Sequence, residues 1–188
     1  MKKTTPDKYH YEKIFSQKKK FVFKYDQGII RDILKYKKSG KVLDLGCGLG
    51  GLSLDLAQKG YDVTCVDISG TAIAQIKKEA GKKNVKITAI CKDLEEYEIK
   101  GSYDIILTLG VLQFLGEDGE DWIKKIQAHT IKDGINIIDA FRNKWLPKGK
   151  LEILYSQWKT LEKEEYIWEK EDFGKMIYLI TQNTQSLT

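Results

Sequence analysis

The chain has 188 residues, 41% hydrophobic and 31% charged with two prolines, a composition that indicates one globular domain and excludes intrinsic disorder of the whole chain. No stretch approaches the roughly 18 consecutive apolar residues of a membrane span, so we expect a cytoplasmic protein without a membrane partner. The formal net charge of +5 comes from dispersed lysines with arginine only at Arg31 and Arg142, which argues against nucleic acid as a partner, because arginine supplies most bidentate base and phosphate contacts.

The chain begins with a candidate cap and a helix. Residues 9–25 are rich in aromatic residues and lysine without a clear period, and we treat residues 1–28 as a candidate lid or cap segment over a site. Apolar residues at helical spacing from Ile29 to Leu34 then predict a helix that ends near Gly40.

From residue 41 to about residue 140, short apolar runs alternate with segments of helical period. Strands are predicted over residues 42–45, 61–66, 85–90, 105–107 and 135–140. Helices are predicted from Leu52 to near Gly60, from an amino cap at Ser69 to Gly81, and from about Asp118 through Ile126. Five strands with crossover connections predict an α/β fold, a doubly wound Rossmann-like sheet.

The last elements are predicted to close this sheet. Residues 150–158 look helical, and residues 160–168 and 175–181 look like two strands joined by a turn at residues 172–174. We therefore expect a mostly parallel seven-stranded sheet with helices on both faces and an antiparallel closing strand. The chain is treated as one domain, residues 1–188, with a core over 29–181 and a flexible tail over 182–188.

The three cysteines are Cys47, Cys65 and Cys91. They lie in or beside apolar runs, with no Cys-x-x-Cys spacing and no nearby histidine. We expect buried free thiols and no metal site.

A glycine-rich loop, residues 44–51, follows the first predicted strand and opens the next helix. Glycines there permit a tight turn and a close backbone approach to a ligand, and the free amides at the helix start favour polar or anionic groups. Dinucleotide folds use Gly-x-Gly-x-x-Gly, whereas this loop has Gly46-x-Gly48-x-Gly50. Asp44, inside the strand end, would repel a pyrophosphate but could hold the loop or a cationic ligand. The pattern favours a sulfonium cofactor.

Asp67 lies just past the second predicted strand, about twenty residues after the loop. A carboxylate in that position can accept hydrogen bonds from both hydroxyls of a ribose. The alternative role is a helix cap or turn acid beside Ser69.

Residues 41–115 resemble class I S-adenosylmethionine methyltransferases. The loop matches the glycine motif of that family, and the resemblance continues through residues 60–63, 66–69, 93–94 and 103–107. By this resemblance, Asp44 and the loop backbone hold the methionyl end, Asp67 the ribose, and Ile68 a face of the adenine. Asp93 and the Leu94 amide hold the adenine edge, and Thr108 borders the methyl group. The implied cofactor-binding residues are Asp44, Gly46, Cys47, Gly48, Gly50, Asp67, Ile68, Asp93, Leu94 and Thr108.

Within that superfamily the chain resembles in particular the tellurite-resistance methyltransferases, through residues 56–63 and 111–115. The resemblance implies S-adenosylmethionine as cofactor, S-adenosylhomocysteine as product, and chalcogen oxyanions or other small nucleophiles as methyl acceptors. The sequence departs from that family at residues 131–135, which replace a Pro-Gly-Gly turn, and near residues 168–170, where a late His-Arg pair is absent.

Methyl transfer to a nucleophilic atom needs alignment more than a dedicated base, so the catalytic residues stay open, with two candidates. Arg142, just beyond the fifth predicted strand, could hold an anionic substrate, or form a surface ion pair instead. His10 could act as a base in the cap segment, whereas His129 shares a helical face with Trp122 and is expected to pack in the core.

The leading hypothesis is S-adenosylmethionine-dependent methyl transfer to a small-molecule nucleophile, such as a chalcogen oxyanion, a thiol or an amine. Two alternatives stay open: a non-catalytic S-adenosylmethionine-binding module, and a nucleic-acid methyltransferase. The chain is expected to be a monomer or a homodimer.

Overall fold

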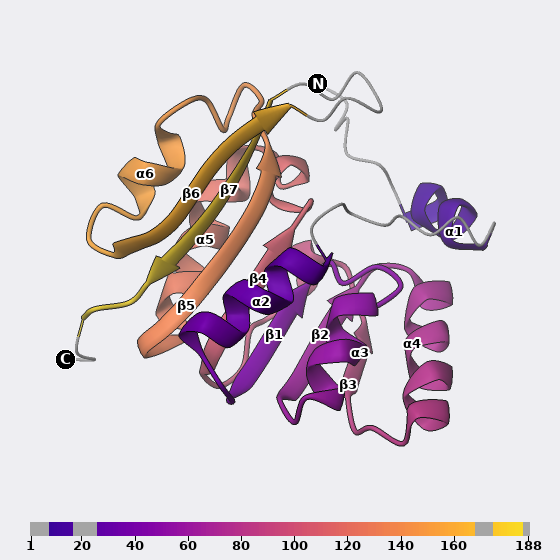
Figure 1. Ribbon diagram of the computed structural model, residues 1–188. Coiled ribbons are helices and arrows are strands. Elements are labelled where there is room, and N and C mark those ends of the chain that lie inside the picture. The colour runs from indigo at the N-terminus through magenta and orange to yellow at the C-terminus, as the bar shows by residue number, and fades with distance from the viewer. Residues whose placement is uncertain (1–7, 17–25, 168–174, 186–188) are drawn as a thin grey trace. The chain divides into compact units, whose positions relative to one another are not determined.

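The computed structural model describes residues 8–16, 26–167 and 175–185. The chain divides into two compact units, Met1–Glu98 and Ile99–Thr188. The strands form a seven-stranded sheet in the order β3-β2-β1-β4-β5-β7-β6 (Figure 1). None of the helices in the described ranges is long and apolar enough to cross a membrane.

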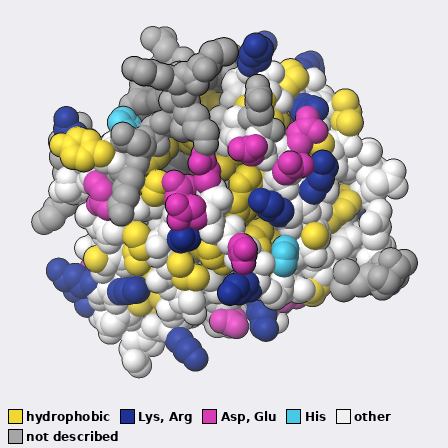
Figure 2. All heavy atoms as spheres, turned by 180° about the vertical axis from the view of Figure 1, so that it is seen from behind, with side chains coloured by type: hydrophobic (Ala, Val, Ile, Leu, Met, Phe, Trp, Pro, Cys, Tyr) yellow, Lys and Arg dark blue, Asp and Glu magenta, His cyan; other side chains and the backbone are white. Residues whose placement is uncertain are grey.

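Positive charge is dispersed over the surface seen in Figure 2, where lysine and arginine side chains lie among acidic and hydrophobic ones. Both arginines contact carboxylates: Arg31 lies 3.8 Å from Asp32, and Arg142 lies 2.6 Å from Glu165. Neither guanidinium is therefore presented alone as a phosphate contact.

Among its described residues, the first unit contains three parallel strands and four α-helices. In chain order its elements are α1 (Lys8–Ser16), α2 (Asp26–Tyr36), β1 (Lys41–Leu45), α3 (Gly51–Gln58), β2 (Asp62–Asp67), α4 (Gly70–Lys83), β3 (Thr88–Cys91) and the 3₁₀ turn η1 (Leu94–Glu96). The register pairs Asp44 of β1 with Cys65 of β2, and Asp67 of β2 with Cys91 of β3. The carboxyl ends of these strands thus bring Asp44, Asp67 and the segment after β3 to one edge.

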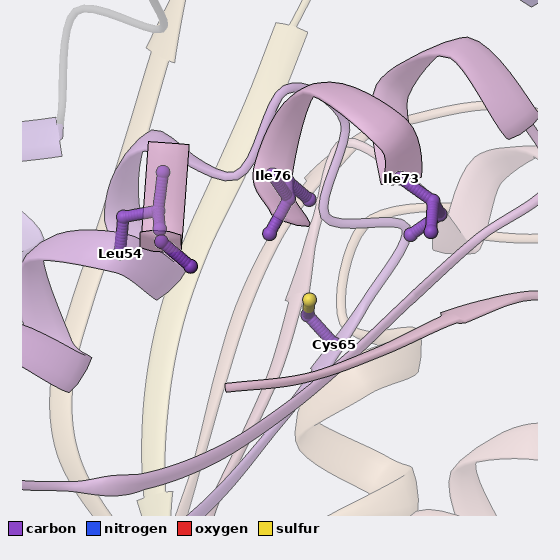
Figure 3. Close-up of a cluster of buried hydrophobic side chains, with 5 residues drawn as sticks. Leu54, Cys65, Ile73 and Ile76 are labelled. Carbon is purple, nitrogen blue, oxygen red and sulfur yellow. The ribbon is translucent and has the colours of Figure 1, made fainter. Parts of the chain in front are cut away.

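The core of the first unit forms where α3 and α4 pack on β2. Leu54 of α3 and Ile73 and Ile76 of α4 gather around the fully buried Cys65 (Figure 3). The Ser69 hydroxyl accepts a hydrogen bond from the Ala72 amide at 3.1 Å, which confirms the predicted amino cap of α4. The helix continues past Gly81, its predicted end, and stops at Asn84, which takes the left-handed conformation instead.

The second unit supplies the other four strands. Its elements are β4 (Tyr103–Leu109), the 3₁₀ turns η2 (Leu112–Phe114) and η3 (Gly116–Asp118), α5 (Gly119–Ala128), β5 (Thr130–Phe141), α6 (Lys150–Leu154), β6 (Lys159–Ile167) and β7 (Lys175–Gln182). β4 and β5 are parallel, and β7 runs antiparallel to both β5 and β6. The predicted mostly parallel, doubly wound seven-stranded sheet with an antiparallel strand near its end is confirmed. The turn predicted at residues 172–174 lies outside the described residues.

A chain of buried hydrogen bonds ties the helices of the second unit to β5. The Tyr155 hydroxyl donates to Oδ1 of Asn136 at 2.9 Å, and the Asn136 amide donates to Oγ1 of Thr130 at 2.8 Å. The Thr130 hydroxyl in turn donates to the Ile126 carbonyl at 2.7 Å. These three hydrogen bonds connect α5 and the residue that ends α6 to β5.

The start of β5 differs from the prediction, which began this strand at residue 135. The strand starts at Thr130, and its pairing with β4 is irregular between Tyr103 and Ile105. Asp133 has a φ of 61°, and an added Cβ at Gly134 would lie 2.8 Å from the Ile131 carbonyl. The segment that replaces the expected Pro-Gly-Gly turn is therefore a bulge inside the strand. Asn183, just after β7, is buried and donates to the Thr130 carbonyl at 2.9 Å.

Two predictions about single side chains were wrong. Cys91 is exposed, because it ends the edge strand β3, although Cys65 is buried and Cys47 is half-buried. His129 does not pack in the core: it ends α5, and its Nδ1 lies 2.6 Å from the Gly101 carbonyl. Within the described residues, no cluster of three His, Cys, Asp or Glu side chains is placed to hold a metal ion.

Candidate cofactor site

The glycine loop is held against the end of β2 by backbone hydrogen bonds. The amides of Gly46 and Cys47 both donate to the Val66 carbonyl, at 2.8 and 3.1 Å. Gly46, Gly48 and Gly50 have φ values of 74°, 52° and 72°, in the left-handed region that favours glycine. The loop thus passes close to the strand ends with no side chains at three of its positions.

Gly50 is required for a second reason. An added Cβ there would overlap Cγ1 of Ile76, a fully buried side chain of α4. Gly50 also precedes α3 as its amino cap and makes no side-chain hydrogen bond to the helix. The close approach of loop and α4 therefore depends on glycine at this position.

Asp67 is the side chain that organises the loop. It is 6% exposed, its Oδ2 accepts from the Gly48 amide at 2.8 Å, and its Oδ1 accepts from the Ser69 amide at 2.9 Å. Burial raises the pKa of the Asp67 carboxyl, the two amides lower it in part, and the charge of Glu12 adds to the rise. The alternative role of Asp67 as a turn acid describes these two hydrogen bonds, and its role toward a ribose stays a prediction.

Asp44 anchors the other side of the loop. Its side chain is buried, and Oδ2 accepts a hydrogen bond of 2.6 Å from the Ser53 hydroxyl. Because Ser53 belongs to the first turn of α3, this bond fixes the end of β1 to the start of the helix. A cationic ligand at the loop would be attracted by the buried charge of Asp44.

The backbone amide of Cys47 helps to hold the glycine loop on β2, whereas its thiol is not activated for chemistry. A hydrogen bond with Cys65, burial, and the charges of Asp44 and Asp67 raise the pKa of the Cys47 thiol well above its usual value. The thiol is therefore protonated at neutral pH and is a poor nucleophile.

Helix α1 lies against the loop, in a segment whose residues show no clear helical period. The Phe15 ring lies 3.5 Å from the place that a Cβ of Gly48 would take, and Tyr11 stacks on Phe15 with 6.1 Å between ring centroids. Burial and the charge of Asp67 raise the pKa of the Tyr11 hydroxyl to about 12. The spacing of the two aromatic residues, four apart, was the available signal for a helix that covers the loop.

Glu12, on the same helix, was missed by the sequence analysis. Its Oε1 accepts from the Gly70 amide at 2.6 Å and its Oε2 from the Thr71 amide at 3.2 Å. The Thr71 hydroxyl and these two amides lower the pKa of Glu12. Glu12 thus binds the first two amides of α4, which begins three residues after Asp67.

The residues predicted for the adenine lie at the ends of β2 and β3. Ile68 is half-buried, and its carbonyl accepts from the Cys91 thiol at 3.6 Å. Asp93 caps η1 by accepting from the Glu95 amide at 3.0 Å, and Leu94 is buried. All three belong to the same unit as the glycine loop, and their roles toward adenine stay predictions.

Two predicted site residues belong to the second unit. Thr108, near the end of β4, is 2% exposed, and its hydroxyl has no hydrogen-bond partner among the described residues. Arg142 follows β5 and pairs with Glu165 at 2.6 Å, with 11% of its side chain exposed. The ion-pair alternative for Arg142 therefore describes its contact, although the Arg142 side chain is mostly buried and only its partner Glu165 is exposed.

His10, the candidate base, is exposed on α1, and its ring meets the Tyr11 ring edge-on at 5.6 Å. The second unit also holds a carboxyl that the sequence analysis did not single out. Asp139 of β5 is 1% exposed, and both of its oxygens accept from the Tyr166 hydroxyl, at 2.8 and 2.9 Å. Burial raises the pKa of Asp139 to about 7, against the effect of the Tyr166 bond.

Comparison with known proteins identifies a family model, described as tellurite resistance protein TehB, that matches residues 9–173. A protein of Haemophilus influenzae (strain 10810), named probable S-adenosyl-L-methionine-dependent methyltransferase TehB, is 32% identical over 163 residues. That alignment covers 80% of this chain and 57% of the relative. A second Haemophilus influenzae TehB is covered to 54%, so the chain spans little more than half the length of these curated relatives.

Solved structures show the same architecture. The crystal structure of TehB from Haemophilus influenzae aligns with a TM-score of 0.77 and 28% identity, over 92% of this chain and 67% of that one. The N-methyltransferase NodS from Bradyrhizobium japonicum WM9, solved with S-adenosyl-L-homocysteine, aligns with a TM-score of 0.72 over 85% of this chain and 86% of that one. At 16% identity, the second likeness shows the fold alone.

Proposed function

Because this chain belongs to the family of the tellurite resistance protein TehB, we propose that it is an S-adenosylmethionine-dependent methyltransferase acting on a small-molecule nucleophile. The observation that carries the proposal is the joining of the glycine loop to Asp67 through the Gly48 amide at 2.8 Å. This bond places a carboxylate and a side-chain-free turn at one end of the parallel strands, where ligands bind in open α/β sheets.

Two features of the residues support a sulfonium nucleoside there. The buried carboxylates of Asp44 and Asp67 suit a cationic ligand and disfavour a pyrophosphate. Both already accept hydrogen bonds, but a carboxylate has about four acceptor sites, so Asp67 retains capacity for ribose hydroxyls. Ile68 offers an apolar surface for a base.

When bound, S-adenosylmethionine supplies an electrophilic methyl group on a sulfonium sulfur, which keeps the bonding electron pair when the methyl carbon bonds to the acceptor. The protein then has to orient the two reactants, and fixed geometry can contribute up to about 7–11 kcal/mol. Asp67 and the loop backbone would hold the nucleoside, and the bond from Ser53 to Asp44 would keep the loop rigid. S-adenosylhomocysteine is the product.

Among the acceptor classes, the contacts of Arg142 favour a thiol or an amine over an oxyanion. The guanidinium is paired with Glu165, and Lys163 is paired with Glu152 at 2.7 Å. An anionic substrate would have to compete with Glu165 for Arg142 or with Glu152 for Lys163, and both cations already have a carboxylate partner.

Calorimetry with S-adenosylmethionine and S-adenosylhomocysteine tests the proposal, with methylated products of thiols, amines and selenite or tellurite followed by mass spectrometry. Asp67→Ala is expected to weaken cofactor binding by about 1.5–3 kcal/mol, as for a hydrogen bond to a charged group. Asp62→Ala, at the exposed start of the same strand, should leave it unchanged. No heat with either compound would contradict the proposal, and binding without any product would indicate a non-catalytic module.

A further inference from the structure

Glu12 reaches α4 from a helix 58 residues earlier in the chain. Figure 1 shows α1 beyond the amino end of α4, and the carboxylate accepts from the first two amides of that helix, at 2.6 and 3.2 Å. The amino end of a 14-residue helix attracts anions, because its first amides lack partners within the helix. In this protein those amides are already bound by a carboxylate of the chain itself.

The position of this carboxylate relates it to the nucleoside site. Gly70 comes three residues after Asp67, the side chain proposed to accept from the ribose hydroxyls. In nucleotide-binding α/β folds, the group after the second strand decides whether a free ribose hydroxyl or a phosphate is accepted there. If a ribose binds at Asp67, a phosphate on its hydroxyls would come close to the Glu12 carboxylate.

The charges at this point are not balanced. The amides and the Thr71 hydroxyl keep Glu12 ionised, and its charge is felt at Asp67, whose pKa it raises. No lysine or arginine in the described part of the chain forms an ion pair with either carboxylate. Two neighbouring negative charges attract a cationic ligand and repel a phosphate.

We propose that Glu12 is a specificity-determining residue of the cofactor site, which admits a nucleoside with free ribose hydroxyls and excludes one phosphorylated at the 2′ or 3′ position. The inference rests on the proposed function, since it needs a nucleoside beside Asp67. It adds α1 to the site and gives its carboxylate a role in choosing the ligand, not only in capping α4.

The test compares the affinities of adenosine and of adenosine 2′-monophosphate by competition against bound S-adenosylhomocysteine. The wild-type protein is expected to prefer adenosine, and Glu12→Gln should reduce that preference about tenfold by removing one nearby charge. Because glutamine retains an oxygen that can accept from the Gly70 amide, Glu12→Gln separates charge from helix capping. Glu12→Ala, which also frees the amides, should reduce the preference at least as much.

Glu79→Ala is the matched control, since it removes a carboxylate near the other end of α4, where Glu79 pairs with Lys82 at 2.7 Å. It should leave the preference for adenosine unchanged. If S-adenosylhomocysteine binds and Glu12→Gln keeps the wild-type preference, or if the wild type binds the two adenosines equally, the inference is wrong and the proposed function stands. If S-adenosylhomocysteine binds to none of the variants or the wild type, the proposed function fails, and the inference fails with it.

Discussion

Each unit of the molecule has a buried aspartate on a strand, Asp67 or Asp139, and the two carboxyls accept hydrogen bonds from different kinds of donor. Asp67 in the first unit accepts from two backbone amides, those of Gly48 and Ser69. Asp139 in the second unit accepts with both oxygens from one phenol, Tyr166. Burial raises the pKa of both carboxyls, and that of Asp139 reaches about 7.

The difference shows what each unit does with buried polar groups. Around Asp67 the partners are the backbone of a tight turn, so the carboxylate shapes a loop for a ligand. Around Asp139 and Asn136 the partners are side chains, which tie β6 and the end of α6 to β5. The first unit depends on the conformation of glycines, whereas the second joins its strands and helices through hydrogen bonds between buried side chains.

Gly50→Ala should produce the largest effect. The added methyl group would overlap Ile76, and the alanine backbone would have to keep a φ of 72°, which is strained for any residue with a side chain. We therefore expect a loss of about 3–5 kcal/mol in the free energy of unfolding, together with loss of cofactor binding. Denaturant unfolding and calorimetry measure the two. Gly51→Ala, where nothing lies within 4 Å, should fold as well as the wild type. Equal stability of both variants would contradict the dependence of the first unit on Gly50.

Asp139→Asn should change the pH dependence of stability. In the folded state the pKa is about 7 against an ordinary 3.8, so the proton binds more tightly in the folded protein. The stabilisation of the folded protein by the proton on Asp139 is fully present below pH 3.8 and is lost as the pH rises through 7. Over this range the free energy of unfolding should fall by roughly 2–4 kcal/mol. Denaturant unfolding at about pH 4 and about pH 8 should show this fall in the wild type and a smaller fall in Asp139→Asn.

Asp62→Asn, which changes an exposed aspartate, is the control for this measurement and should keep the wild-type pH dependence. Parallel curves for the wild type and Asp139→Asn would mean that Asp139 titrates near its ordinary pKa in the folded protein. In that case the contrast between Asp139 and Asp67 would disappear.

Tyr155→Phe tests the side-chain network of the second unit. Removal of the hydroxyl leaves Oδ1 of Asn136 without this donor in a buried position, and we expect a loss of about 1–3 kcal/mol in the free energy of unfolding. Tyr9→Phe, at a side chain that is 78% exposed, should have no measurable effect. If Tyr155→Phe has the same free energy of unfolding as the wild type, packing and not the hydrogen bond holds the end of α6.

Ser69→Ala should give the smallest of these effects. It removes the hydrogen bond to the Ala72 amide at the start of α4, worth about 1 kcal/mol in the free energy of unfolding. Thermal unfolding of the variant beside Ser16→Ala, whose exposed hydroxyl donates to the Lys13 carbonyl, measures the difference. A loss as large as that of Gly50→Ala would mean that the cap, and not the glycine turn, dominates this edge of the first unit.

Local patterns predicted most of the strands and the centre of the site. β1 and β2 lie within one residue of their predicted ranges, because a short apolar run between turn residues is a local signal. The glycine loop was found from the spacing of its glycines after the first strand, and Asp67 from its place just past the second strand. Helix α1 was missed, because its aromatic side chains Tyr11 and Phe15 pack against the glycine loop and do not form a regular apolar face along the helix.

The sequence by itself determined the alternation of strands and helices, the tight turn after β1 and the carboxylate after β2, because each follows from the backbone freedom and polarity of neighbouring residues. Only the tertiary structure decided which groups are partners: Glu12 with the amides of α4, and Tyr166 with Asp139, 27 residues apart. The exposure and charge of a side chain depend on whichever distant segment covers it. No local pattern of residues carries that information.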